Sequence, residues 1–220
     1  GKMQHVTFDI DLVDEEFLAD GTMFDGSSIA GWKAINESDM KLRPDLDSAI
    51  IDPFYQQTTM ALFCDVVNPD DGSPYERDPR SIAKTALNYV KQAGVGDTVY
   101  FGPEAEFFVF DDVRWGTDPH NTFYAYDSTE LPVSSKKEYL EGNMGHRPGP
   151  KGGYFPVNPV DSGQDLRGEM LAVMGELGMQ PEKHHHEVAS AQHELGLKFS
   201  DLITMADRMQ LYKYVIHNVA

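Results

Sequence analysis

One stretch, FGPEAEFFVF at residues 101–110, constrains the fold of this chain more than any other. Its alternating pattern predicts a β-strand in which Glu104 and Glu106 share one face, among apolar residues. Two neighbouring carboxylates in apolar surroundings repel each other and resist losing water. A bound cation would remove that repulsion, and the simpler alternative is that both side chains face solvent. The stretch therefore predicts a sheet and a candidate cation site.

A second pair of glutamates lies in a predicted β-hairpin. Residues 179–199, MQPEKHHHEVASAQHELGLKF, are typical of two strands joined by a short turn, with Glu187 and Glu194 near the ends of the predicted hairpin. Carboxylate oxygens suit Mg²⁺ and Mn²⁺. A gap of seven positions would put these two glutamates on opposite faces of one unbroken strand, so a turn or bulge must reset the register if both bind one metal.

The histidines before Glu187 could suggest zinc. His184 and His186 share one face of the predicted strand, and His185 shares the other with Glu187. Zinc enzymes commonly present a helical HExxH or a Cys/His set, and the sequence has neither. Imidazole also suits transition metals better than Mg²⁺. We expect one or two of these histidines to pack beside the site or to support its ligands, and a direct metal role is the less favoured alternative.

Charge and composition limit the partners. The net charge of −18 argues against nucleic acid or an anionic membrane as the main partner and suits a protein that holds cations, although solubility alone could explain it. The apolar runs are too short to span a membrane, and the start shows no signal-peptide pattern. The single cysteine, Cys64, cannot form an internal disulfide, so a cytoplasmic location is the simplest expectation.

The chain divides into two predicted regions. Residues 1–77 are strand-like and rich in turns, with a strand expected at residues 6–10, and a Pro-, Asp- and Gly-rich connector at residues 68–79 marks the boundary. Residues 78–220 form the second region. Because the first strand has nothing before it to pair with and the last helix ends without Gly or Pro, we expect a part of a longer protein.

The second region contains three predicted helices and one long loop. Asp78 should cap a helix ending at Gly94, with Ile82, Ala86 and Val90 as its buried stripe. A second helix should span residues 162–177 with Asp161 as its cap, and a third should begin after Ser200 or Asp201. Residues 112–153 are weakly periodic and predict a long loop.

Six motifs, taken in order, resemble the bacterial type I glutamine synthetase family. They are MFDGSSIAGWKAINESDM, RDPRSIAK, FGPEAEFFVFDD, GHRPGPKGGYFPVNPVDS, HHHEVASAQHELG and MQLYKYVIHNVA, and together the match covers essentially all 220 residues. The resemblance implies an α+β fold. A small β-grasp amino-terminal domain with a truncated start would occupy residues 1–77. Part of a catalytic domain, with a curved antiparallel sheet and flanking helices, would occupy residues 78–220.

The resemblance also implies an activity. The family ligates ammonia to the γ-carboxylate of L-glutamate through a γ-glutamyl phosphate, with ATP as co-substrate and two Mg²⁺ or Mn²⁺ ions in each complete active site. The partners would be L-glutamate, ammonium and ATP, in a homododecamer of two hexameric rings with active sites shared between subunits. A related γ-glutamyl ligase for another amine and a non-catalytic metal-bound member are the alternatives. The FDGSS loop favours ammonia, and the retained carboxylates favour catalysis.

Metal ligands follow from the same match. Glu106 would bind one metal together with Glu187 and Glu194, and Glu104 would help to bind the second. The family's other ligands of the second metal, and its glutamate- and phosphate-binding arginines, match positions beyond Ala220. We therefore expect the 220 residues alone to be inactive.

The remaining matched residues concern the substrates. Glu182 and Phe199 match residues that contact ATP. Asp25 and Ser28 match the loop that binds ammonium, and Tyr154 matches a tyrosine near it. By local pattern alone, Asp25 and Ser28 would be ordinary turn residues that satisfy backbone N–H groups.

Overall fold

The computed structural model describes residues 2–131 and 147–220. Contacts divide the chain into two compact units. Unit 1 comprises Gly1–Phe101 and Phe199–Tyr214, and unit 2 comprises Gly102–Lys198 and Val215–Ala220. The helix α4 (Leu202–Val219) contributes residues to both units. No helix in the described ranges is long and apolar enough to cross a membrane.

Unit 1 contains a three-stranded antiparallel sheet in the order β1-β2-β5 and a separate hairpin of β3 and β4. Met40 and Val66 of this sheet form a small core with Tyr75, and Phe24 and Trp32 pack against that core. These strands agree with the strand-like, turn-rich character expected of residues 1–77. The elements of this part are α1 (Glu15–Asp20), β1 (Thr22–Asp25), β2 (Asp39–Pro44), β3 (Ile50–Asp52), β4 (Thr59–Ala61), β5 (Cys64–Val67) and short 3-10 helices at Ile10–Leu12, Gly26–Ser28, Ile35–Glu37 and Leu46–Ser48.

The strand expected at residues 6–10 is not formed. Residues 2–9 are irregular, and the first regular element is the 3-10 helix at Ile10–Leu12, which Asp9 caps by accepting the N–H of Asp11 at 3.0 Å. An alternating pattern becomes a strand only when a neighbouring strand satisfies its backbone groups, and the sheets of the described residues include no strand from this segment.

Helix α2 (Pro79–Gln92) begins where the sequence predicts. The Asp78 carboxylate accepts the N–H of Ser81 at 3.1 Å, and Pro79 is the first helical residue. The predicted buried stripe is wrong, because Ile82 is 55% exposed in this structure whereas Ser81 is buried. Charge rather than apolar packing holds the inner face of α2, through the ion pairs of Arg80.

Arg80 on α2 pairs with three carboxylates from distant segments of unit 1. Its guanidinium lies 2.6 Å from Asp45, 2.7 Å from Asp65 and 2.9 Å from Asp207 on α4. Bidentate, largely buried pairs of this kind fix orientation strongly. They turn the Arg80 side of the helix inward, which helix periodicity alone does not predict.

The start of α4 follows from its cap. The Asp201 carboxylate accepts the N–H of Ile203 at 3.2 Å and that of Thr204 at 3.1 Å, so the predicted start is confirmed. Just before it, β12 (Ser200–Asp201) pairs with β6 (Tyr100–Phe101).

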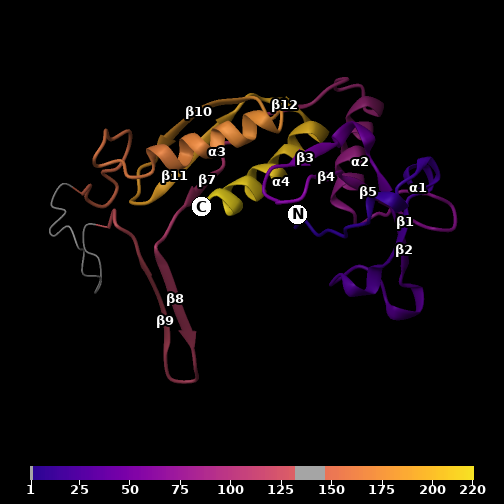
Figure 1. Cartoon of the computed structure of the whole chain (residues 1–220), viewed down its shortest axis with the longest axis horizontal. Helices are drawn as coiled ribbons and strands as arrows, with labels where there is room; N and C mark the ends of the chain where they lie inside the picture. Colours follow the sequence, from indigo (N-terminus) through magenta and orange to yellow (C-terminus); the bar gives the residue numbers. More distant parts are fainter. Residues whose placement is uncertain (1, 132–146) are drawn as a thin grey trace. The chain divides into compact units, whose positions relative to one another are not determined.

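Unit 2 is built on an antiparallel sheet in the order β10-β11-β7, formed by β10 (Pro181–His186), β11 (Gln192–Leu197) and β7 (Glu106–Phe108). The predicted hairpin at residues 179–199 is therefore confirmed. Helix α3 (Gln164–Glu176) runs along β10 and β11 (Figure 1). Met170 and Met174 of α3 and Leu195 of β11 are almost fully buried, so the core of this unit lies between the helix and one face of the sheet.

Two expectations in unit 2 need correction. The run at residues 101–110 is not one strand, because residues 102–105 separate β6 from β7, and Glu104 and Glu106 are exposed rather than enclosed by apolar groups. Helix α3 begins at Gln164 with Gly163 as its N-cap and without a side-chain cap. Asp161 does not cap the helix, because its carboxylate is engaged by Arg167 at 2.5 Å.

The long loop predicted at residues 112–153 is wrong for its first part. β8 (Asp112–Thr117) and β9 (Thr122–Asp127) form a regular antiparallel hairpin, which extends away from the β10-β11-β7 sheet of the same unit (Figure 1). Asp118 forms its turn by accepting the N–H groups of His120 and Asn121 at 2.8 and 2.7 Å. Residues 132–146 of the predicted loop lie outside the described residues.

Candidate metal centre

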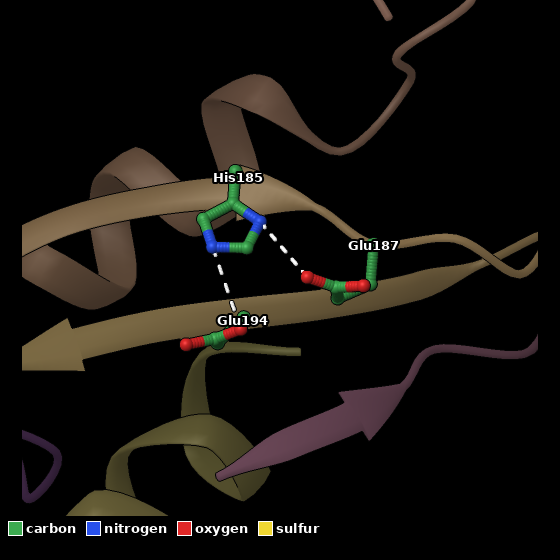
Figure 2. A group of neighbouring side chains, drawn as sticks. All are labelled: His185, Glu187 and Glu194. Atoms are coloured by element: carbon green, nitrogen blue, oxygen red, sulfur yellow. Dashed lines mark ion pairs between the residues drawn. The ribbon is translucent and has the colours of Figure 1, made fainter. Parts of the chain in front are cut away.

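Three potential metal ligands gather on one face of the sheet in unit 2. His185 comes from β10, Glu194 from β11, and Glu187 follows the end of β10 (Figure 2). One ligand atom from each lies within 4.8 Å of the others. The Nδ1 atom of His185 is 3.3 Å from Glu187 Oε1, and its Nε2 atom is 3.4 Å from Glu194 Oε2. The imidazole therefore lies between the two carboxylates.

The strand register explains why an odd spacing brings Glu187 and Glu194 together. His185 is the direct cross-strand partner of Glu194, and the N–H of Glu187 donates to the carbonyl of Gln192 at 2.8 Å. Cross-strand partners point to the same face, as do residues two apart on one strand. The turn at residues 188–191 thus resets the register, as the sequence required for a shared site.

Burial and charge make this group a reasonable cation site. Glu187 and Glu194 are only 9% and 5% exposed. Burial raises the pKa of Glu194, and the nearby charges of Glu104 and Glu187 act in the same direction. His185 Nδ1 is buried and has no hydrogen-bond partner among the described residues. Two buried carboxylates beside an unsatisfied imidazole nitrogen are a donor set that fits a divalent cation.

The other two predicted metal ligands lie close by but outside this tight group. Glu106 on β7 is the direct cross-strand partner of Glu194, and its carboxylate accepts a hydrogen bond from the side-chain amide of Gln192. Glu104 precedes β7, is exposed, and is near enough for its charge to raise the pKa of Glu194. The structure therefore joins Glu187 and Glu194 with His185, and leaves Glu104 and Glu106 at the edge.

An aromatic pair borders the group. The rings of Tyr154 and Phe155 are stacked, with centroids 4.1 Å apart and an interplanar angle of 15°, and the His185 ring lies 5.9 Å from Tyr154 and 4.8 Å from Phe155. Hydrogen bonds from Gly153 N–H to the Val188 carbonyl and from Phe155 N–H to the His186 carbonyl hold this segment beside the hairpin. Tyr154, predicted from the sequence, is thus near the candidate ligands, and Phe155 was missed.

The opposite face of the hairpin carries buried polar residues that sequence reasoning did not single out. Arg167 of α3 is fully buried. It pairs with Asp161 and donates to Nδ1 of His184 at 3.1 Å, and it lies 2.9 Å from Nδ1 of His193. Burial and the Arg167 charge lower the pKa of His193 to about 4, so this imidazole is neutral. His184 and His186 face this side, as their alternation with His185 predicts.

Glu130 is the second missed residue. It is 4% exposed and lies 2.7 Å from Nε2 of His186. Burial alone would raise its pKa, but hydrogen bonds from His186 and Ser162 outweigh burial and hold the pKa at about 2. Its neighbours in sequence show no local signal, because its partners lie far along the chain. What marks Glu130 is the burial of an acidic side chain, and burial is visible in the structure and not in the sequence.

Asp25 and Ser28 belong to a tight turn in unit 1. The Asp25 carboxylate accepts the N–H of Ser27 at 2.8 Å, its hydroxyl at 2.6 Å and the Ser28 hydroxyl at 3.0 Å. Hydrogen bonds from Ser27, followed by that from Ser28, lower the pKa of Asp25. Both Asp25 and Ser28 are exposed, so the turn presents an ionised carboxylate to solvent in this unit.

The residues matched to ATP contacts are both exposed. Phe199 of unit 1 is 58% exposed, and its ring meets that of Tyr100 edge to face at 5.5 Å. Glu182 of unit 2 lies where the β10–β11 register shifts between Pro181 and Lys183. Such a bulge redirects the side chain of the extra residue.

Together these features define an α+β protein that carries a carboxylate-rich candidate site on an antiparallel sheet. Two family models match it: the glutamine synthetase β-grasp domain at residues 1–69, and the glutamine synthetase catalytic domain at residues 76–220. The chain belongs to the glutamine synthetase family. The predicted fold class, a β-grasp domain followed by catalytic-domain sequence, is confirmed.

Individual relatives agree with this assignment. The chain is 63% identical to a glutamine synthetase from Azorhizobium caulinodans and 64% identical to one from Bradyrhizobium diazoefficiens, in each case over all of this chain and 47% of the relative. A cryo-EM structure of Plasmodium falciparum glutamine synthetase matches with a TM-score of 0.87 at 27% identity, over 96% of this chain and 42% of that one. The chain thus spans about half the length of the curated relatives it matches.

Proposed function

We propose that this chain provides part of the active site of an ATP-dependent glutamate–ammonia ligase. The reaction would join ammonia to the γ-carboxylate of L-glutamate through a γ-glutamyl phosphate and give L-glutamine, ADP and phosphate. The observation that carries the proposal is the grouping of His185, Glu187 and Glu194 within 4.8 Å, in a chain that belongs to the glutamine synthetase family. We also propose residues 1–77 as the β-grasp domain and residues 78–220 as part of the catalytic domain.

The carboxylates would hold Mg²⁺ or Mn²⁺. Glu187 and Glu194 would bind one ion together with Glu106, whose strand position opposite Glu194 supports this role. Glu104 would help to bind a second ion. His185 is an additional candidate ligand, because its buried Nδ1 atom lacks a hydrogen bond, and an imidazole ligand favours Mn²⁺ over Mg²⁺. When bound, the divalent cation supplies positive charge that offsets the charge on the phosphate oxygens during phosphoryl transfer.

Asp25 would bind ammonium. Its lowered pKa keeps it ionised near neutral pH, so it attracts a cation, but the same lowering makes it a weak base. We assign it first to capture of ammonium and then to acceptance of a proton as the nitrogen attacks the acyl phosphate. Ser28 would orient the Asp25 carboxylate through the hydroxyl that already donates to it, and Tyr154 would line the site of attack. Glu182 and Phe199 would contact ATP.

The complete enzyme would be a cytoplasmic homododecamer of two hexameric rings, with active sites shared between neighbouring subunits. Support for this proposal is the family membership together with the position of Asp25 in a different compact unit from the metal-binding glutamates. Asp25 binds no metal in this proposal, so it requires the metal-bearing unit to complete the chemistry.

The test is Glu194→Gln in the full-length protein. This change keeps the side-chain shape and removes one buried charge. We expect the Mn²⁺ dissociation constant to rise by about tenfold or more and ATP-dependent glutamine formation to fall with it. Glu176→Gln, an exposed residue at the end of α3, is the control and should change neither. Unaltered Mn²⁺ binding and glutamine formation in Glu194→Gln would show that the proposed site is wrong.

A further inference from the structure

Glu130 is a buried carboxylate whose two oxygens are fully engaged. Oε1 accepts the N–H of Ser162 at 3.2 Å and its hydroxyl at 2.7 Å. Oε2 accepts the N–H of Ala191 at 2.7 Å and lies 2.7 Å from Nε2 of His186. These partners come from the segment before α3, the end of β10 and the turn before β11. One side chain therefore connects three separate segments of unit 2.

His186 extends the connection to Glu187. Its ring is 1% exposed, and its Nδ1 atom lies 2.6 Å from the backbone carbonyl of Glu187. Both ring nitrogens face acceptors, a carbonyl oxygen and a carboxylate, so the ring is held between Glu187 and Glu130. Glu130 thus acts through this imidazole on the backbone of a candidate metal ligand.

The position of Glu187 depends on the turn as well as on the sheet, where its N–H donates to the carbonyl of Gln192 of β11 at 2.8 Å. β10 ends at His186, so Glu187 lies beyond the strand. On the other side of the turn, Ala191 has a φ of +60°, in the left-handed region that residues other than Gly and Asn rarely adopt. Its N–H is the group that Glu130 accepts. The carboxylate therefore secures both the residue before Glu187 and the strained residue that closes the turn.

We propose that Glu130 is a positioning residue that fixes the turn at residues 187–191 and thereby holds Glu187 beside Glu194 for cation binding. The inference rests on the proposed function of the group formed by His185, Glu187 and Glu194. Glu130 itself does not contact the cation in this account. It acts on the geometry of the ligands through His186 and Ala191, as the outer partners of metal ligands commonly do.

The competing explanation is that Glu130 merely stabilises the fold of unit 2. Another buried ion pair, Asp161 with Arg167, provides the comparison. It joins the segment before α3 to the same hairpin through His184 and His193, but it makes no hydrogen bond to residues 187–191 among those described. Replacement of either acid by its amide removes one buried charge. Only the change at Glu130 should alter the turn.

The experiment compares Glu130→Gln, Asp161→Asn and Glu194→Gln in the full-length protein. Mn²⁺ dissociation constants are measured from the electron paramagnetic resonance of free Mn²⁺, and hydrogen exchange is followed at the Ala191 amide. We expect Glu130→Gln to weaken Mn²⁺ binding about 10- to 100-fold and to speed exchange at Ala191, with Asp161→Asn within about threefold of wild type in both. Equal weakening in Glu130→Gln and Asp161→Asn, or no weakening in Glu130→Gln, would overturn the inference.

Two further arms keep the result interpretable. If Glu130→Gln loses its circular dichroism signal, Ser162→Ala is read instead, because it removes one hydrogen bond to Glu130 and leaves the carboxylate. Weaker Mn²⁺ binding and faster Ala191 exchange in Ser162→Ala support the inference, and unchanged values overturn it. If Glu194→Gln itself leaves Mn²⁺ affinity unchanged, the proposed cation site is wrong and the role of Glu130 falls with it. If only Glu194→Gln weakens binding, the proposed function stands and the role of Glu130 is refuted.

Discussion

Glu106 on β7 and Glu194 on β11 lie directly opposite each other in the antiparallel register of the sheet. Directly opposed like charges destabilise a sheet by a fraction of a kcal/mol to about 1 kcal/mol. A hydrogen bond from the Gln192 amide to Glu106 compensates one carboxylate, and His185 lies next to the other. The two carboxylates therefore destabilise the sheet when no cation is bound, and they can serve as ligands when a cation binds.

This relationship predicts opposite effects of Glu106→Gln on stability and on metal binding. Without metal, loss of one of two facing charges should raise the free energy of unfolding by up to about 1 kcal/mol. With metal, the remaining carboxylates should hold Mg²⁺ or Mn²⁺ more weakly, so half-maximal activity should need several-fold more metal. Chemical unfolding in EDTA and metal titration of activity measure the two effects in the full-length protein.

Glu176→Gln serves as the matched control for Glu106→Gln, because it removes an exposed glutamate charge from the same unit. It should change the unfolding free energy by less than about 0.5 kcal/mol and leave the metal requirement unaltered. A metal requirement in Glu106→Gln equal to that of wild type would mean that Glu106 is not a ligand.

A second prediction concerns the acid range. The pKa of Glu130, about 2, lies below its ordinary value of 4.5 because hydrogen bonds from His186 and Ser162 outweigh the effect of burial. The folded state thus binds this proton more weakly than the unfolded chain. The stabilisation is fully present above pH 4.5 and is lost as the pH falls towards 2. At about 1.4 kcal/mol per pKa unit, the change amounts to a few kcal/mol.

Urea unfolding of wild type and Glu130→Gln in EDTA checks this at several pH values. The difference between the two unfolding free energies should be largest near pH 5 to 6, roughly, and should shrink steadily below about pH 4.5. His186 lies against Glu130, and Glu130 raises the pKa of this imidazole against the effect of burial. The comparison therefore stays below the pH range in which His186 loses its proton. A difference that is constant across the acid range contradicts the prediction.

Gly153 gives a third prediction. A Cβ atom added there would lie 2.8 Å from Cε1 of His186 and 3.0 Å from the carbonyl oxygen of Glu187. Gly153→Ala must therefore displace backbone next to a candidate ligand. We expect a loss of about 1–3 kcal/mol of unfolding free energy and weaker Mn²⁺ binding. Gly149→Ala is the control, since a Cβ at that position meets nothing within 4 Å. Equal effects of the two changes would contradict the close approach at Gly153.

The parts of the fold that the sequence predicts are those with local causes. Asp78 and Pro79 define the start of α2 through neighbouring backbone groups. The two strands around the turn at residues 188–191 show their pattern within about twenty residues. The approach of Glu187 to Glu194 could also be predicted, because a turn between the two strands resets their register and both glutamates lie in this short segment. Each of these features depends on residues that are close in sequence.

The parts that failed depend on distant partners. Ile82 could not be placed correctly, because the orientation of α2 is set by the pairing of Arg80 with Asp207, 127 residues away. Glu130 was missed because its hydrogen-bond partners lie 32, 56 and 61 residues further along the chain. The sequence predicts a loop in place of the β8–β9 hairpin because most residues of the hairpin are exposed on both faces, so it lacks the alternation of a half-buried strand.

The last prediction concerns Asp25 and sharing of the active site between subunits. In the proposed reaction, ammonium must be captured and must lose a proton beside the acyl phosphate, and Asp25 is our candidate for both tasks. Asp25→Ala in the full-length enzyme should therefore leave γ-glutamyl phosphate formation largely intact and slow its aminolysis by about 100-fold or more. Glu106→Ala should instead impair phosphoryl transfer. Rapid-quench measurement of ATP cleavage and of glutamine formation separates the two steps.

Mixed oligomers test whether Asp25 acts across a subunit boundary. Full-length Asp25→Ala and Glu106→Ala subunits are dissociated, mixed and reassembled, with each parent alone taken through the same procedure as a control. If active sites are shared between subunits, some interfaces will combine an intact Asp25 turn with an intact set of metal glutamates, and activity should return. With random placement in closed rings, about one interface in four would be complete, because each partner is chosen independently. Mass spectrometry must first show that the rings are mixed. Mixed rings that remain as inactive as either parent would mean that Asp25 serves its own subunit, or does not serve the reaction.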